Sequence, residues 1–194
     1  LKKNQKNDYS QSYKRSLWTY GFFTSLGGLT SQLIFSIDIL TIGYLIHDPK
    51  EIAYYKTASL IPFALLFIPD GVMKTDLVKL TQNYMNKEFL KKYVKNYFKI
   101  FFIISLIIYI VLYLFAGLII SLFGTEYILA KNLIPVFGLG LIGAFLFRNP
   151  FGNIITCVGW AKTNTVISII TLVLDLLLNM ILIKRYGIIG AAYS

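Results

Sequence analysis

Cysteine and histidine are almost absent from this chain of 194 residues. It contains one cysteine, Cys157, and one histidine, His47. A single cysteine excludes an internal disulfide and a cysteine-based metal site, and the sequence has no His-Glu-x-x-His motif. It also lacks the Gly-x-x-x-x-Gly-Lys-Ser/Thr loop that binds nucleotide phosphates. We therefore expect no metal, no cofactor and no ATP hydrolysis.

Acidic residues are scarce as well. Nine Asp and Glu stand against 19 Lys and Arg, which gives a net charge of +10. The carboxylates are scattered singly, whereas a membrane-embedded transferase or protease needs acidic or nucleophilic groups clustered at one interface. The chain is therefore not expected to be an enzyme. Basic segments on an apolar chain indicate topology and contact with membrane lipids before nucleic acid.

Apolar residues are abundant. They make up 56% of the chain, and the mean hydropathy is +0.65. About 20 apolar residues cross the hydrocarbon core as a helix, and five stretches are long enough: 18–46, 52–80, 97–123, 128–158 and 164–183, with a sixth beginning at 188. The sequence therefore predicts an all-α, polytopic membrane helix bundle, with a basic linker over 1–16 and a transmembrane domain over 17–194. Pro62 and Pro69 are expected to interrupt the second span, and Pro135 and Pro150 the fourth.

The distribution of Lys and Arg predicts the orientation. The N-terminal segment, the loop at 83–95 and the loop near 160 lie on one side of the predicted membrane, and most of the 19 basic residues belong to them or their flanks. Cytoplasmic loops carry the excess of Lys and Arg. We therefore expect these three segments in the cytoplasm and the turn at 124–127 outside.

A carboxylate, Asp175, lies within the fifth span. An ionisable group near the bilayer centre costs at least ~2.5–3.5 kcal/mol, so it usually faces a bundle interior or a water-filled path. Polar residues of this span recur three and four apart, on one helix face: Asn164, Ser168, Thr171, Asp175 and Asn179. Asp175 either lines a substrate or ion pathway, or is protonated and hydrogen-bonded between helices.

The first span has a second polar face. Its small and polar residues fall near a seven-residue repeat: Thr24, Gly27, Ser31, Asp38 and Thr41. Lys56 on the second span lies at a depth from which it could reach Asp38 or snorkel outward. Asp70 and Lys74 are four apart, which favours an ion pair at the interface over a substrate site.

Several short patterns together resemble one family. They are SID at 36–38, IAYYKTA at 52–58, LFGTEY at 122–127 with Ala130, GWAK at 159–162, LN at 178–179 and YGIIGAA at 186–192. In this order they are similar to Wzx-type polysaccharide flippases, which belong to the MOP (multidrug/oligosaccharidyl-lipid/polysaccharide) exporter superfamily with the MATE-like exporters. Two positions depart from the family pattern, because Ala53 replaces a usual Gly and Asp175 a common Asn.

The resemblance implies that the spans are helices seven to eleven of a twelve-helix, two-lobe exporter, with the N-terminal lobe as a partner. Such proteins flip an undecaprenyl-diphosphate-linked oligosaccharide across the bacterial cytoplasmic membrane by alternating access. The two polar faces would suit a sugar headgroup, and Lys56, Arg148 and Lys162 are candidates for its diphosphate. For Arg148 and Lys162 the alternative is anchoring at the cytoplasmic interface.

Three hypotheses remain open at this stage. The first is a lipid-linked oligosaccharide flippase whose pathway includes Asp38, Asp175 and the other candidates above. The second is a multidrug or metabolite antiporter of the same superfamily, coupled to H⁺ or Na⁺ through Asp38 or Asp175. The third is a membrane scaffold that does not transport and recruits partners or anionic lipid through its basic loop, against which the buried polar faces argue.

Overall fold

A computed structural model describes the backbone of residues 2–194 and the side chains of residues 16–194. Every element over residues 2–194 is helical. Five helical stretches are long and apolar enough to cross a membrane: Ser16–Ile46, Pro49–Gln82, Lys87–Leu114, Thr125–Cys157 and Ala161–Tyr186. The predicted all-α membrane bundle with five spans is confirmed. The side chains of residues 1–15 lie outside the described residues, so the basic linker over 1–16 stays a prediction.

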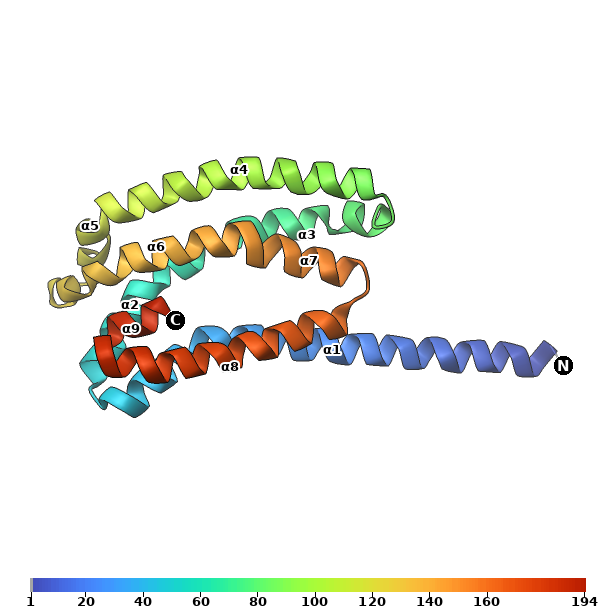
Figure 1. Cartoon of the computed structure of the whole chain (residues 1–194), viewed down its shortest axis with the longest axis horizontal. Helices are drawn as coiled ribbons and strands as arrows, with labels where there is room; N and C mark the ends of the chain where they lie inside the picture. Colours follow the sequence, from blue (N-terminus) through green and yellow to red (C-terminus); the bar gives the residue numbers. More distant parts are fainter. Residues whose placement is uncertain (1) are drawn as a thin grey trace.

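Residues 2–194 form eleven helical elements (Figure 1). They are α1 (Lys2–Ile46), α2 (Pro49–Leu65), α3 (Phe67–Gln82), α4 (Lys87–Leu114), α5 (Ala116–Ser121), the 3₁₀-helix η1 (Thr125–Asn132), α6 (Leu133–Gly143), the π-helix η2 (Ala144–Arg148), α7 (Asn149–Cys157), α8 (Ala161–Tyr186) and α9 (Ile188–Tyr193). All but α5 and α9 belong to the five spans. The second span is therefore α2 with α3, and the fourth runs from η1 to α7.

Prolines divide the second and fourth spans at one point each. Pro62 lies inside α2 and Pro135 inside α6 without ending either helix, so the prediction is wrong for these two positions. Pro69 has no N–H to donate to the Leu65 carbonyl, and its ring would collide with that carbonyl in a continuous helix; α2 ends at Leu65 and α3 begins at Phe67. Pro150 likewise cannot bond to the carbonyl four residues before it, and the π-helix η2 ends two residues earlier, at Arg148. The breaks lie next to Leu66 and Arg148, two residues that line the groove described below.

The third span differs from the prediction of 97–123. The helix α4 begins at Lys87, where Asn86 caps it by accepting a hydrogen bond of 3.0 Å from the Phe89 N–H. It ends at Leu114, and the short α5 follows as a separate helix. Hydropathy misses the first turns because they carry lysines, which stay exposed while aromatic side chains pack inward. The capping residue was the signal for the true start.

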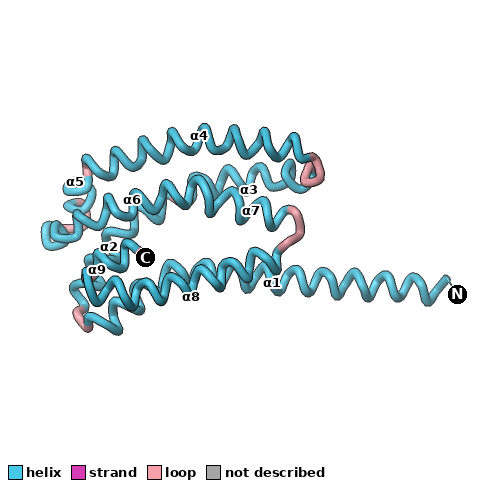
Figure 2. Tube along the Cα trace, in the orientation of Figure 1, coloured by secondary structure: helices cyan, strands magenta, loops and turns pink. Residues whose placement is uncertain are grey.

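Two groups of helices make up the bundle. The helices α1 and α8 lie side by side and run in the same direction, while α2, α3, α4, α6 and α7 form the other group (Figures 1 and 2). The pair α1–α8 approaches closely at Gly27, where an added Cβ would lie 3.0 Å from Thr165 Oγ1. Thr165 Oγ1 donates a hydrogen bond of 2.6 Å to the Phe23 carbonyl, which fixes the register of the pair.

The helix α9 turns back from α8 towards the middle of the bundle (Figure 1). The turn occurs at Gly187, whose φ of +60° and ψ of −145° are essentially restricted to glycine. The turns α3–α4 and α7–α8 lie at one end of the bundle, and the turns α1–α2 and α8–α9 at the other (Figure 2). This matches the predicted alternation of the loops, and the assignment of the first end to the cytoplasm stays a prediction.

Candidate functional site

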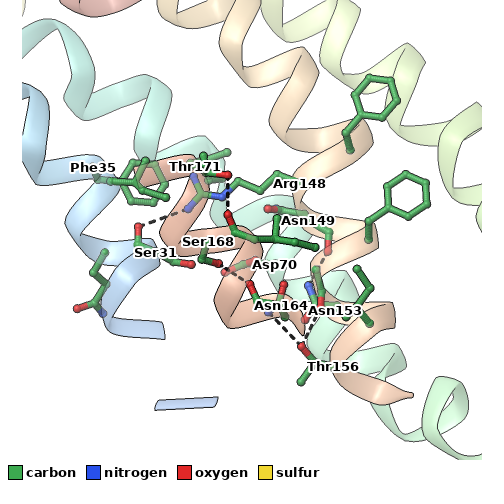
Figure 3. A pocket seen from close by; sticks show the side chains of 18 of the residues that line it. Ser31, Phe35, Asp70, Arg148, Asn149, Asn153, Thr156, Asn164, Ser168 and Thr171 are labelled. Atoms are coloured by element: carbon green, nitrogen blue, oxygen red, sulfur yellow. Dashed lines mark hydrogen bonds between the residues drawn. The ribbon is translucent and has the colours of Figure 1, made fainter. Parts of the chain in front are cut away.

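A large cavity separates the two helix groups at the end that carries the α3–α4 turn. It has a volume of about 1140 Å³ and lies between α1 and α8 on one side and α3, η2 and α7 on the other. Its polar lining consists of Ser31, Gln32, Asp70, Arg148, Asn149, Asn153, Thr156, Asn164, Ser168 and Thr171, most of which Figure 3 labels. We call this cavity the wide compartment. Aromatic and aliphatic side chains form the rest of its wall, so amides, hydroxyls, one cation and one carboxylate lie on a largely apolar surface.

A second cavity of about 340 Å³ adjoins the first one towards α9, and we call it the narrow compartment. Its charged lining residues are Asp38, Arg148 and Asp175, and apolar residues of α6 and α9 supply much of its wall. Six residues line both compartments: Ile34, Phe35, Phe63, Leu66, Arg148 and Thr171. The two compartments are therefore parts of one groove.

A buried hydrogen-bond cluster around Asp38 lies at the narrow compartment. Tyr55 Oη donates to Asp38 Oδ2 at 2.5 Å, and Asn179 Nδ2 donates to Asp38 Oδ1 at 2.7 Å. Tyr55 and Asn179 are 0% exposed and Asp38 is 9% exposed. The Ser194 hydroxyl lies 3.1 Å from Asn179 Oδ1. One carboxylate thus joins α1 to α2 and α8, and through Asn179 to the residue after α9.

Asp175 lies one turn before Asn179 on α8 and lines the same compartment as Asp38. Its Oδ2 atom is enclosed, yet it has no hydrogen-bond partner among residues 16–194. A buried polar atom without a partner costs free energy, so each example in a native protein calls for an explanation. Asp38 accepts a hydrogen bond at each of its oxygens, whereas Asp175 Oδ2 accepts none from the described residues. Two carboxylates of this kind at one compartment suit the binding of a cation or proton.

Arg148 is the last residue of the π-helix η2 and reaches across the groove to α1 (Figure 3). Its Cζ lies 4.6 Å from the centroid of the Phe35 ring, and its Nη2 donates to the Ser31 carbonyl at 3.4 Å. No carboxylate of the described side chains lies within ion-pair distance of it. The guanidinium therefore keeps most of its five donors for a ligand.

The other predicted site residues divide into two groups. Ser168 and Thr171 line the wide compartment, and their hydroxyls donate to helix carbonyls one turn earlier, each at 3.0 Å. Lys56 and Lys162 line neither compartment. Lys56 is exposed and Asp38 bonds to Tyr55 in its place, while Lys162 Nζ lies 6.0 Å from the Phe23 ring.

The predicted ion pair at the end of the second span is present. Lys74 Nζ lies 3.8 Å from Asp70 Oδ2. Asp70 also lines the wide compartment, which the sequence argument did not expect.

Sequence reasoning missed Tyr55 and Phe35 as functional candidates. Tyr55 lies beside Lys56 in one of the short motifs, and its aromatic hydroxyl within a span was a usable signal, because such groups find partners when buried. Phe35 gave no signal, because apolar residues fill the first span. Asn149 and Asn153 follow the proline break and also line the wide compartment.

The comparison with known proteins gives one family match. A family model described as MatE matches residues 24–181, which covers both carboxylates, Arg148 and most of the groove lining. No curated protein and no solved structure matches the chain.

Proposed function

The chain belongs to the MatE family of membrane exporters, and on that premise we propose that it translocates a lipid-linked oligosaccharide. The cargo would be an undecaprenyl-diphosphate-linked repeat unit, moved across the bacterial cytoplasmic membrane by alternating access. The residues of the wide compartment would receive its headgroup. The resemblance to Wzx-type flippases supplies the identity of the lipid and a first lobe facing the groove.

The observation that carries the proposal is the lining of the wide compartment. Amide groups of Asn149, Asn153 and Asn164 and hydroxyls of Ser168 and Thr171 line it, beside aromatic rings that can pack against sugar faces. Such groups both donate and accept hydrogen bonds, as sugar hydroxyls do. Arg148 adds one cation without a carboxylate partner among the described side chains, and a guanidinium binds phosphate oxygens through two parallel hydrogen bonds.

The size of the cavity points the same way. Sites for drug-sized molecules occupy roughly 300–1,000 Å³. The wide compartment measures about 1140 Å³ without the N-terminal lobe that the resemblance implies. The compartment is therefore large enough to receive a headgroup of several sugars. The lipid tail would remain in the bilayer, against the exposed apolar side chains of the outer helix faces.

A second candidate function is a cation-coupled multidrug or metabolite antiporter. The unpartnered Oδ2 of Asp175 favours it, because this carboxylate shares the narrow compartment with Asp38. A proton or Na⁺ bound there would be released as the compartment opens to the other side. Coupling of this kind is also compatible with a flippase, so the nature of the cargo separates the two functions.

A gene replacement in the source bacterium tests the cargo. Deletion of the gene should abolish surface glycan and accumulate the lipid-linked repeat unit, and resistance to cationic drugs should stay unchanged. The chain with Asp175→Leu should insert normally, since loss of a buried charge eases insertion, and should restore little glycan. Normal surface glycan combined with lost drug resistance would overturn the flippase in favour of the antiporter.

A further inference from the structure

Arg148 lies where the two compartments meet. Of the six residues that line both compartments, Arg148 carries the only charge. Its guanidinium lies over the Phe35 ring at 4.6 Å and contacts the Ser31 carbonyl, so it bridges η2 and α1 between the compartments (Figure 3). The wide side holds amides, hydroxyls and one carboxylate, Asp70, which pairs with Lys74, whereas the narrow side holds Asp38 and Asp175 without an ion-pair partner among the described side chains.

The Phe35 ring also packs against other aromatic rings. Phe63 of α2 contacts it edge to face, with centroids 4.9 Å apart, and Phe137 of α6 packs against Phe63 in the same manner at 5.6 Å. Edge-to-face pairs at these distances are favourable and fix ring orientation. Phe35 therefore presents a stable face to the guanidinium, and three aromatic side chains support the bridge.

We propose that the contact between Arg148 and Phe35 is an anion-operated divider between the two compartments. An anionic group that enters the wide compartment draws the guanidinium off the ring, and the narrow compartment then opens to the wide one. A cation or proton then reaches Asp38 and Asp175 from the wide compartment. The inference rests on the proposed function for the choice of a diphosphate as the natural anion, and it assigns Phe35 as a positioning residue.

The strengths of the competing contacts support this order of events. Arg148 makes one long hydrogen bond of 3.4 Å and one contact with a ring face, and it has no ion pair among residues 16–194. A diphosphate offers charge-assisted, two-pronged hydrogen bonds, which are stronger than a cation–π contact. Exchange of the ring for the anion is therefore favourable.

The element that carries Arg148 is suited to such a movement. It ends a π-helix, whose wide turn is a local insertion in the α-helical ladder and often occurs at functional sites. The next residue, Asn149, has an enclosed Nδ2 without a hydrogen-bond partner in the described part of the chain. A π-helical turn and an unpartnered amide therefore lie directly beside the guanidinium.

The negative charge of the narrow compartment determines which ions the divider would control. Asp38 and Asp175 would repel a diphosphate from the narrow compartment while attracting cations into it. Arg148 repels those same cations when it occupies the passage. An anion bound to Arg148 removes both the obstruction and the repulsion, so cargo on one side controls ion access on the other.

Thiol accessibility tests the divider in the reconstituted full chain. Single cysteines replace Ala192 in the narrow compartment or Ser168 in the wide one, in a Cys157→Ser background. A small cationic methanethiosulfonate is added at the face that carries the α3–α4 turn, and the ratio of the two labelling rates is measured. The rate at Ser168 corrects for any general change in charge.

Two substitutions leave the positive charge in place and remove the contact. Arg148→Lys loses the planar group that covers the ring, and Phe35→Leu loses the ring face. Each should raise the ratio by roughly threefold to thirtyfold, the factor that one cation–π contact represents. The matched control is Phe67→Leu, which removes another ring that lines only the wide compartment, and it should leave the ratio unchanged.

Inorganic pyrophosphate serves as the anion. It should raise the ratio in the otherwise native chain by a similar factor and have no further effect in Phe35→Leu. Equal ratios in the native chain and in both variants would overturn the divider, even if glycan export proceeds. A divider that opens in the variants but ignores pyrophosphate would overturn its operation by anions. A correct labelling pattern without glycan export would contradict the proposed function and leave the divider standing.

Discussion

Tyr55→Phe should destabilise the protein measurably, although it removes a single oxygen atom. The Tyr55 hydroxyl is fully enclosed and donates to Asp38 at 2.5 Å. Phenylalanine keeps the ring, and therefore the edge-to-face contact with Phe137 at 5.2 Å. The variant thus isolates the hydrogen bond from the packing.

The magnitude follows from the burial and the charge of the acceptor. Hydrogen bonds between membrane helices contribute about 0.6 kcal/mol on average and up to about 1.7 kcal/mol, and bonds to charged groups contribute about 1.5–3 kcal/mol. A short bond to a 9% exposed carboxylate belongs at the top of the first range. We expect a loss of about 1.5–2 kcal/mol, a factor of roughly 10 to 30 in the unfolding equilibrium.

The assay is thermal or denaturant unfolding of the purified chain in detergent. Tyr54→Phe is the matched control, since Tyr54 contacts the Tyr127 ring at 6.0 Å and its hydroxyl makes no hydrogen bond within the described part of the chain. It should change stability by only a few tenths of a kcal/mol, as surface substitutions do. Equal stability of the two variants would refute the view that Asp38 holds the helices together.

Three other predictions concern topology, charge and packing. In a cysteine-free background, Met85→Cys should label only from the cytoplasm and Thr125→Cys only from outside; labelling of Met85→Cys in intact cells would reverse the orientation. Asp175→Asn keeps the shape and polarity of the side chain but cannot ionise, and it should retain glycan export within about twofold, because lining the groove is the proposed role; a lost dependence on the pH gradient in proteoliposomes would support cation coupling instead. Gly190→Ala should cost about 1–3 kcal/mol, because its Cβ would overlap the α8 backbone, whereas Gly117→Ala, with open space around its Cβ, should not lower the melting temperature.

The sequence predicted the features that depend on one helix at a time. Span number follows from hydropathy, and the break before α3 follows from Pro69. The spacing of polar residues on α8 predicted a single polar face, and Ser168, Thr171 and Asp175 all line the groove. Each of these features is set by local geometry, so no knowledge of neighbouring helices was needed.

Features that depend on two helices were beyond the sequence. Depth alone suggested Lys56 as a partner for Asp38, but the rotation of α2 about its axis presents the preceding residue, Tyr55. The contact between Arg148 and Phe35 joins η2 to α1 across the groove and depends on how the two helix groups diverge. Rotation and divergence arise from packing of whole helices, which a pattern of apolar residues does not encode.

Obstruction of the groove during transport tests whether the cargo's headgroup passes through it. A fluorescent lipid-diphosphate oligosaccharide is reconstituted with the full chain, and its translocation is measured before and after a bulky thiol reagent is attached to Ser168→Cys in the wide compartment. The control is Ile107→Cys on α4, because Ile107 is 57% exposed and lines neither compartment. Modification at 168 should stop translocation, and modification at 107 should leave it unchanged. Undiminished translocation with the reagent attached at 168 would contradict the assignment of this groove as the path of the headgroup.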